Sequence, residues 1–310
     1  MELPRREAAN MPHDERLTAE QQAVFPTIIR AVSGSEVHGT GLGEAVSDID
    51  HMGISVEPVE YVLGLRQSPA LWTFRSAHGR EEPVPVKEQE TAGKNGKTQK
   101  GAGSTTGRRK VTPPPAKRSE PGDLDYTIYP LRKWARLATA GNPTVVIPVF
   151  CSEEHIVSMN EFGESLRANR DRFVTSRLVR RHLSYATHQR QQMTGELSKK
   201  VHRKELVSAH GYDVKFAGHY LRLLHQGLGI LESGTLALPL AQPYRDHVLA
   251  VRRGEVSYDD VLSEGRHLEE ALEQAIEKTT LPEDVDMAWL HGWLTWAQTA
   301  TWRESGQLAA

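Results

Sequence analysis

Cysteine is almost missing from this chain, because Cys151 is the only one among 310 residues. No disulfide can therefore form within the chain, which fits a reducing compartment. The sequence around Cys151 also lacks the His/Asp context that is typical of a nucleophilic thiol. The cysteine content thus argues against both a disulfide-stabilised fold and thiol chemistry.

Long apolar runs are missing as well. No stretch approaches the roughly 20 apolar residues that a membrane-spanning helix requires. Residues 1–7 contain no apolar core of a signal peptide. We therefore expect a cytoplasmic protein with no membrane partner.

Neither sign of charge is in large excess. The chain has 38 Lys and Arg against 40 Asp and Glu, which gives a formal net charge of −2 and an isoelectric point near 6.7. A uniformly basic surface is excluded, but a local basic groove is not, because attraction of anions depends on how charge is distributed. With 38% hydrophobic and 25% charged residues, the chain is long enough for a sizeable core and favours two domains.

Several motifs that carry known chemistry are absent. The sequence has no Cys/His cluster with zinc-binding spacing and no Gly-x-x-x-x-Gly-Lys phosphate loop. The glycines between positions 34 and 43 do not match the Gly-x-Gly-x-x-Gly pattern of dinucleotide-binding folds. Carboxylates remain as the most informative candidate groups.

The first half of the chain is predicted to mix strands and helices. We expect a helix over 18–30, a short strand over 29–33, a strand continuing through 51–56, and a strand over 123–129 that leads into a helix at Pro130. The apolar run 145–150 is rich in β-branched residues and indicates either a strand or another buried segment.

Residues at about 84–121 are rich in Gly, Ser, Thr and Pro, carry Lys and Arg, and have almost nothing to bury. This composition predicts a disordered, basic insertion. Two interpretations of it stay open: a solvated loop, or a mobile arm that attracts nucleic acid.

The second half is predicted to be helical from Asn160 onward. Apolar residues recur there with a period near 3.6, which is typical of amphipathic helices. The four tryptophans near the C-terminus could stack on bases, but the helical spacing of three of them favours a packed core. The expected helices are 162–180, 181–197, 213–232, 258–278 and 284–302.

Two aspartates, Asp48 and Asp50, lie one residue apart on an apolar run. Side chains at i and i+2 of a strand point to the same face, with Ile49 turned towards the core. Adjacent carboxylates repel each other unless a cation lies between them, and such oxygen ligands suit Mg²⁺. The alternative is an exposed pair in a turn. His51, which follows them, is expected to be an exposed strand residue rather than a ligand.

A Gly34-Ser35 turn precedes these aspartates at a predicted helix start. Backbone N–H groups in such a place can bind phosphate. The following segment contains small residues around Thr40, which allow the backbone to approach a ligand closely. A phosphate site next to a metal site predicts phosphoryl transfer.

Two further groups complete the pattern. Asp125 lies on a predicted strand, with Asp123 two residues earlier on the same face. Lys215, His219 and Arg222 fall at i, i+4 and i+7 on one face of a helix. That face is either solvated and paired with neighbouring charges or a contact surface for phosphate.

These residues resemble the nucleotidyltransferase superfamily of DNA polymerase beta, whose pattern is a Gly-Ser turn, an Asp-x-Asp strand and a third carboxylate on a later strand. They are most similar to the YcgL-type nucleotidyltransferases, also called the RNA-repair-pathway polymerase-beta family. The likeness spans most of residues 25–275 outside the insertion, and it is carried further by the stretches 129–134, 141–144 and 211–222.

The resemblance implies an α/β (α+β) polymerase-beta-like catalytic domain over 18–155 and an all-helical domain over 156–305. It implies that Asp48, Asp50 and Asp125 hold two Mg²⁺ or Mn²⁺ ions, with Asp125 also able to act as the general base. It further implies that the nucleoside triphosphate, such as ATP, contacts a set of nucleotide-binding residues: Gly34, Ser35, Thr40, Tyr212, Lys215, His219 and Arg222.

The reaction implied by the resemblance is transfer of a nucleoside monophosphate from an NTP to a hydroxyl group, with release of pyrophosphate. The family name indicates an RNA end, such as that of a tRNA, as acceptor. Two alternatives stay open: nucleotidylylation of a protein or a small molecule, and an inactive module that binds nucleotide or RNA.

Overall fold

The computed structural model describes residues 26–43, 49–66, 72–76, 124–197 and 203–308. Several predictions fall on parts of the chain outside these ranges. They are the helix over 18–25, the aspartates Asp48 and Asp123, and the insertion at about 84–121.

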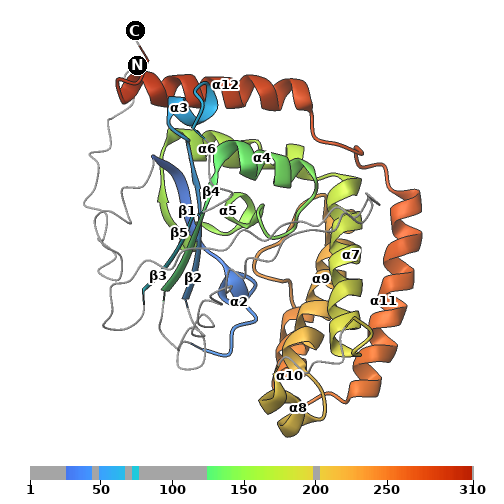
Figure 1. Ribbon diagram of the computed structural model, residues 1–310. Helices are drawn as coiled ribbons and strands as arrows, with labels where there is room; N and C mark the ends of the chain where they lie inside the picture. Colours follow the sequence, from blue (N-terminus) through green and yellow to red (C-terminus); the bar gives the residue numbers. More distant parts are fainter. Residues whose placement is uncertain (1–25, 44–48, 67–71, 77–123, 198–202, 309–310) are drawn as a thin grey trace, which may run out of the picture.

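The described residues contain one mixed sheet of five strands in the order β3-β4-β2-β1-β5. β2 and β4 run parallel, and the other neighbouring pairs are antiparallel (Figure 1). The bounds are β1 Thr27–Val32, β2 Ile49–Ser55, β3 Trp72–Ser76, β4 Leu124–Pro130 and β5 Ile156–Met159.

Strand β1 corrects one prediction, because residues 27–30 are a strand and not the end of a helix. Ile28 and Ile29 are consecutive and both fully buried, so β1 is covered on both faces. A short apolar run of this kind cannot be distinguished from a helix by periodicity alone. The strand expected over 29–33 is confirmed by β1, and the alternation of buried and partly exposed residues along β4 confirms the strand expected there.

Among the described helices, α4 Leu131–Thr139, α5 Ile147–Phe150 and α6 Glu161–Ala168 pack against the sheet, and the one-turn helix α2 Gly34–Val37 contacts β2. α4 begins directly after Pro130, as predicted. α5 is a buried helical turn, so the strand alternative for 145–150 is wrong. Pro148 explains the difference, because proline has no N–H for a strand ladder and its fixed φ suits a first helical turn.

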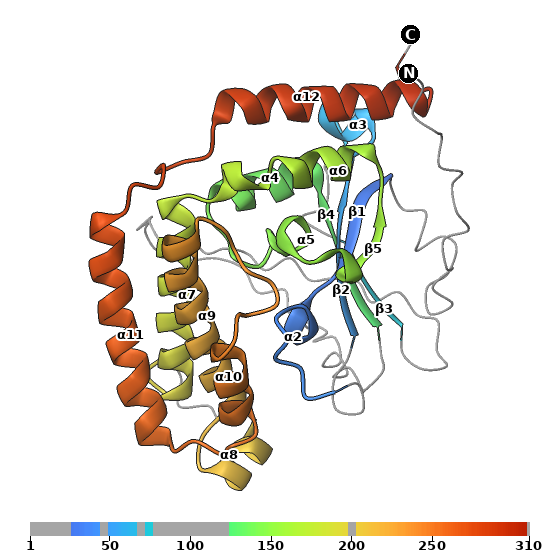
Figure 2. The same cartoon turned by 180° about the vertical axis from the view of Figure 1, so that it is seen from behind.

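Five helices form a second layer beside the sheet, which we call the bundle (Figures 1 and 2). α9 packs against each of the other four. The predicted helix 162–180 is divided, because Thr175 accepts a hydrogen bond from the Leu178 N–H at 3.2 Å and so starts α7 anew. The bundle consists of α7 Ser176–Met193, α8 Lys204–His210, α9 Val214–Ser233, α10 Tyr244–Arg252 and α11 Tyr258–Lys278.

The last helix, α12 Met287–Glu304, returns from the bundle to the sheet side (Figure 1). The indole N–H of Trp302 donates to the Glu57 carbonyl at 2.8 Å, and that of Trp293 donates to Ser165 Oγ at 3.1 Å. Trp293 and Trp302 are buried, as expected for a packed core, whereas Trp296 is 44% exposed. β5, α6 and α12 thus pack with the sheet although they follow residue 155, and the division into two domains stays a prediction.

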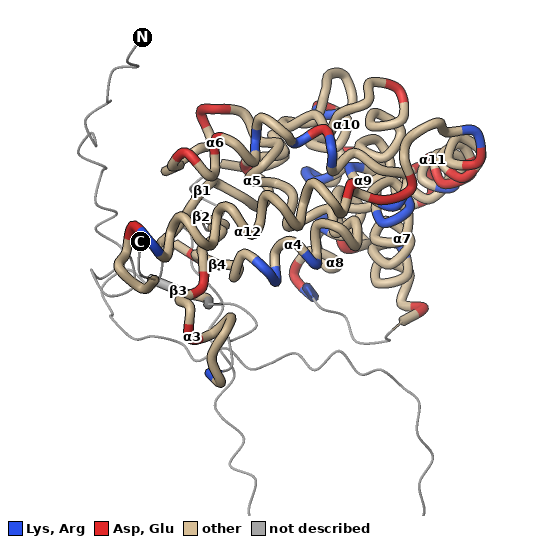
Figure 3. Tube along the Cα trace, turned by 90° about the horizontal axis from the view of Figure 1, so that it is seen from above, with Lys and Arg blue, Asp and Glu red and all other residues tan. Residues whose placement is uncertain are grey.

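The two connections between the sheet layer and the bundle lie side by side. One leads into α7, and the other joins α11 to α12. The Ser176 N–H donates to the Pro282 carbonyl at 2.9 Å, and Arg177 pairs with Asp284. Most of the charged side chains of the outermost bundle helix, α11, are acidic (Figure 3). No helix in the described ranges is both long and apolar enough to cross a bilayer.

Candidate functional site

A cavity of about 330 Å³ lies where the sheet layer meets the bundle, and residues from both layers line it. Its size is within the range of small-molecule sites. From the sheet layer come the turn after β1 and one carboxylate of β2, and from the bundle come side chains of α7, α9 and α10. The predicted residues that line it are Gly34, Ser35, Thr40, Asp50, Lys215, His219 and Arg222.

Asp50 and Asp125 are direct register partners on the parallel strands β2 and β4. Their side chains therefore leave the sheet side by side on the same face. Ile49 points the other way and packs against Leu124, Tyr126 and Ile128. Asp50 lines the cavity, and Asp125 is its neighbour one strand further.

The Gly34-Ser35 turn lies directly against this carboxylate edge. Gly34 has a φ of +67°, and a Cβ atom at this position would overlap Asp50 Oδ2. The Ser33 N–H donates to the Asp50 carbonyl at 2.8 Å. Only glycine fits such a left-handed position in contact with another side chain. The pattern Gly-Ser followed by aspartate is thus explained by close contact of the two segments.

The loop after the turn is held by the bundle. The Thr40 N–H donates to the Ser35 carbonyl at 3.0 Å, and the Thr40 carbonyl accepts a hydrogen bond from Arg252 of α10. The Leu240 N–H donates to the His38 carbonyl at 3.1 Å. The position of the loop therefore depends on contacts with residues about 200 positions later in the chain.

Positive charge gathers on the bundle side of the cavity. Burial lowers the pKa of Arg222 to about 10, and the like charge of Arg252 acts in the same direction. Burial and then Arg203 lower the pKa of Arg252. Among the residues that the structure describes, no carboxylate pairs with Arg222 or Arg252. A cation removed from water without a counter-charge is costly, so this pair is suited to an anionic ligand.

His38 and His219 border the same cations in neutral form. Burial lowers the pKa of both imidazoles, and Arg222 lowers both further. His38 Nδ1 receives hydrogen bonds from Gln226 Nε2 at 3.2 Å and Arg222 Nη1 at 3.4 Å. Because a guanidinium can only donate, Nδ1 is the acceptor and the ring proton is on Nε2.

Tyr212 is the one predicted nucleotide-binding residue that the structure does not bring to this cavity. It is buried, its hydroxyl donates to the Val256 carbonyl at 2.7 Å, and its ring lies 5.7 Å from that of Tyr258. Its neighbour Asp213 caps α9, as predicted, by accepting from the N–H groups of Lys215 and Phe216.

Sequence reasoning missed Arg252, His38 and the neutral part of the cavity wall, which includes Tyr185 and Gln189. The sequence contains one weak indication that Arg252 is buried, since it lies four residues after Val248 and one after Val251. The structure buries both valines fully. The expectation for His51 was wrong, because it is 6% exposed. Arg30 of the neighbouring strand covers it and donates to its Nδ1.

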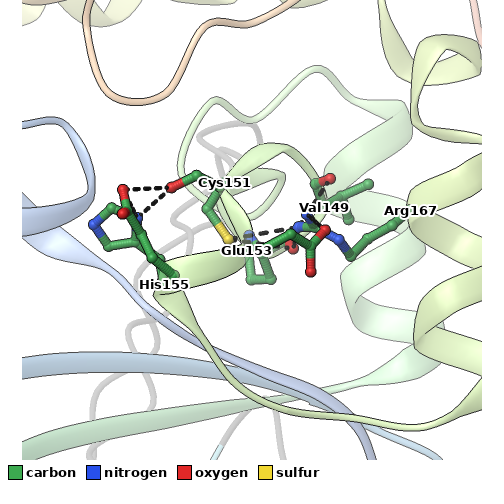
Figure 4. A network of polar contacts seen from close by, with 8 residues as sticks. Val149, Cys151, Glu153, His155 and Arg167 are labelled. Carbon is green, nitrogen blue, oxygen red and sulfur yellow. Dashed lines mark hydrogen bonds and ion pairs between the residues drawn. The ribbon is translucent and has the colours of Figure 1, made fainter.

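Cys151 belongs to a structural network beside the cavity (Figure 4). Arg167 donates to the Pro148 carbonyl at 3.0 Å, lies 3.6 Å from the Cys151 sulfur and pairs with Glu153 at 2.8 Å. Burial raises the pKa of the Cys151 thiol to about 11, so the thiol is protonated at neutral pH. The network caps α5, whose residue Ile147 lines the cavity.

The donor set at the sheet edge fits a divalent metal in its chemistry. Asp50 and Asp125 supply paired carboxylate oxygens, which Mg²⁺ prefers. The described part of the chain holds no group of three or more His, Cys, Asp or Glu side chains placed to bind a metal. Asp48, the third predicted ligand, lies outside that part.

Comparison with known proteins agrees with this geometry. Residues 13–295 match the model of RlaP, the RNA repair pathway DNA polymerase beta family. Searches of curated proteins and of solved structures find no match. The match covers most of the chain and confirms the resemblance seen in its motifs. The chain therefore belongs to the RNA repair pathway DNA polymerase beta family.

Proposed function

We propose that this protein transfers a nucleoside monophosphate from an NTP to the hydroxyl group of an RNA end and releases pyrophosphate. One observation carries the proposal. The guanidinium groups of Arg222 and Arg252, which no described carboxylate neutralises, share a cavity with the Gly34-Ser35 turn and Asp50. This arrangement suits a nucleotide whose polyphosphate lies against the two guanidinium groups, next to the carboxylate of Asp50.

The bundle side would bind the triphosphate. Arg222 and Lys215 are basic side chains that can pair with phosphate oxygens, and a guanidinium can donate two hydrogen bonds to one phosphate group. His219 is neutral and can donate one hydrogen bond without adding charge. The hydroxyl of Ser35 and the backbone of the turn face the same space and would orient the β- and γ-phosphates.

The carboxylate edge would carry the chemistry. The oxygen of the acceptor hydroxyl forms a bond to the α-phosphorus, the bond from that phosphorus to the pyrophosphate oxygen breaks, and the hydroxyl proton passes to the Asp125 carboxylate. Divalent ions bound by Asp50 and Asp125, together with Asp48, would lower the pKa of the hydroxyl and neutralise the departing pyrophosphate. The pairing of Asp50 with Asp125 supports this assignment.

The test uses RNA with a free 3′ hydroxyl, each of the four NTPs labelled at the α-phosphorus, and Mg²⁺ or Mn²⁺. We expect label on the RNA, and a loss of roughly 10²- to 10⁴-fold in Asp50→Asn and Asp125→Asn. Asp123→Asn is the matched control, because Asp123 is the rival aspartate two residues earlier in the sequence, and it should keep activity.

Three outcomes contradict the proposal at different points. Label on protein instead of RNA would change the acceptor. Full activity in Asp50→Asn or Asp125→Asn would show that these carboxylates do not have the proposed catalytic role. Binding of NTP by the wild-type protein with no transfer to any acceptor would support a binding module instead of an enzyme.

A further inference from the structure

The wall of the cavity has a cationic part and a neutral part, and the proposed triphosphate site uses only the cationic part. The cations and the partly buried His219 come from α9 and α10. The residues contributed by α7, by the connection between α4 and α5, and by the start of α5 are all neutral: Tyr185, Gln189, Pro143, Thr144 and Ile147. If the phosphates occupy the cationic part, the remaining wall is suited to the uncharged end of the ligand.

Tyr185 is held in place by Asn142, which belongs to the turn that ends α4. Asn142 Oδ1 accepts hydrogen bonds from the N–H of Thr144 at 2.9 Å and of Val145 at 3.4 Å. This fixes the orientation of the amide, so that its Nδ2 donates to the Tyr185 hydroxyl at 3.1 Å. The ring of Tyr185 is therefore anchored at its far end while it borders the cavity.

Gln189 lies four residues after Tyr185 and thus on the same face of α7. It is partly buried and lines the cavity. Within the described residues, its side-chain amide forms no hydrogen bond. The amide can therefore bond a ligand that brings both a donor and an acceptor.

We propose that the nucleobase of the incoming NTP stacks on Tyr185 and that Gln189 forms hydrogen bonds with its edge, so that these two residues of α7 determine base preference. The inference rests on the proposed function, because it takes the triphosphate to lie against Arg222. Stacking on an aromatic ring is tolerant of base identity, whereas hydrogen bonding to the base edge is selective.

The chemistry of residue 189 makes the inference specific. A glutamine offers one donor and one acceptor group, whereas a glutamate offers two acceptors. Guanine alone presents two adjacent donors, N1–H and N2–H₂, on its pairing edge. Gln189→Glu should therefore shift the preference towards GTP, and Gln189→Leu should reduce the differences among the four NTPs.

The experiment measures dissociation constants by calorimetry for the four NTPs and for inorganic tripolyphosphate, which has no base. We expect Tyr185→Leu to weaken NTP binding about 5- to 100-fold and to leave tripolyphosphate binding unchanged. Tyr185→Phe keeps the ring and should restore NTP binding. Gln191→Leu is the matched control for Gln189→Leu, because it lies on the same helix outside the cavity wall.

The outcomes separate the two proposals. If Tyr185→Leu weakens tripolyphosphate and NTPs equally, or weakens neither, the inference is wrong while triphosphate binding stands. The same holds if Gln189→Glu leaves the order of the four NTPs unchanged. If the wild-type protein binds neither tripolyphosphate nor any NTP, the proposed function itself fails.

Discussion

Gly34 and Asp50 lie so close that a methyl group on the glycine would overlap the aspartate Oδ2 atom. The Gly34-Ser35 turn and the carboxylate edge are therefore in direct contact, with no room for a side chain between them.

Gly34→Ala should reduce nucleotidyl transfer roughly 10²-fold, because the added Cβ must displace the Asp50 carboxylate and small misplacements of reacting groups have effects of this size. Gly43→Ala is the control. Gly43 also has a positive φ, of +99°, but a Cβ there meets nothing within 4 Å. Both variants carry the backbone strain, so equal losses of activity would show that strain and not the contact is responsible.

Arg222→Met should weaken tripolyphosphate binding roughly 10- to 100-fold, as expected for the loss of hydrogen bonds to a charged group. The melting temperature without ligand should change little, because relief of the buried charge offsets the lost 2.7 Å hydrogen bond to Gln226. Thermal unfolding with and without tripolyphosphate measures both effects. Arg177→Met, an exposed arginine paired with Asp284, should leave the ligand-induced shift as in the wild type.

The buried His38 and His182 and the partly buried His219 predict that the protein loses stability in mild acid. Burial lowers the pKa of His38, His182 and His219, that of His182 to about 4 from 6.5. The unfolded chain therefore binds more protons than the folded one below pH 6.5, and the free energy of unfolding falls as the pH falls.

His182→Gln tests this directly, since glutamine can still donate to the Leu178 carbonyl that His182 Nδ1 contacts at 2.9 Å. Between pH 7 and pH 5 the variant should lose about 2 kcal/mol less free energy of unfolding than the wild type. Denaturant titrations at the two pH values give the comparison. An equal loss in both proteins would contradict the assignment of His182.

Trp302→Phe should lower the free energy of unfolding by about 1 to 3 kcal/mol, because it removes the hydrogen bond to the buried Glu57 carbonyl. Trp296→Phe on the same helix is the control, since Trp296 is 44% exposed. Chemical denaturation measures both. A smaller effect at Trp302 than at Trp296 would contradict the view that α12 is fastened to the sheet layer through its C-terminal end.

Much of the fold could be predicted because it is encoded locally. The helix 258–278 has the bounds of α11, and the capping role of Asp213 and the alternation along β4 follow from short patterns. The predictions failed where tertiary contacts decide. His51 was expected to be exposed, and its burial depends on neighbouring strands, from which Arg30 donates to its ring and Tyr126 packs against it.

The candidate site shows the same division. The spacing of Lys215, His219 and Arg222 correctly placed them on one face of a helix, and all three line the cavity. Nothing local predicts that Asp50 is the register partner of Asp125, because the two strands are distant in sequence. The packing of α10 and α7 brings Arg252 and Tyr185 to the cavity. The hydrophobic periodicity of a sequence predicts helices but not how they pack against each other.

The two side-by-side connections between the layers have a mechanical consequence. The hydrogen bond between Ser176 and Pro282 joins the two places where the chain passes between the layers. A swing of α7–α11 about this junction would have to break the contacts of the bundle with Thr40 and Asn142. Such a swing would move Arg222 and Tyr185 together, because both belong to the bundle, towards or away from Ser35. Under the proposed function, the contacts with the base and with the phosphates of a nucleotide would then form and break together.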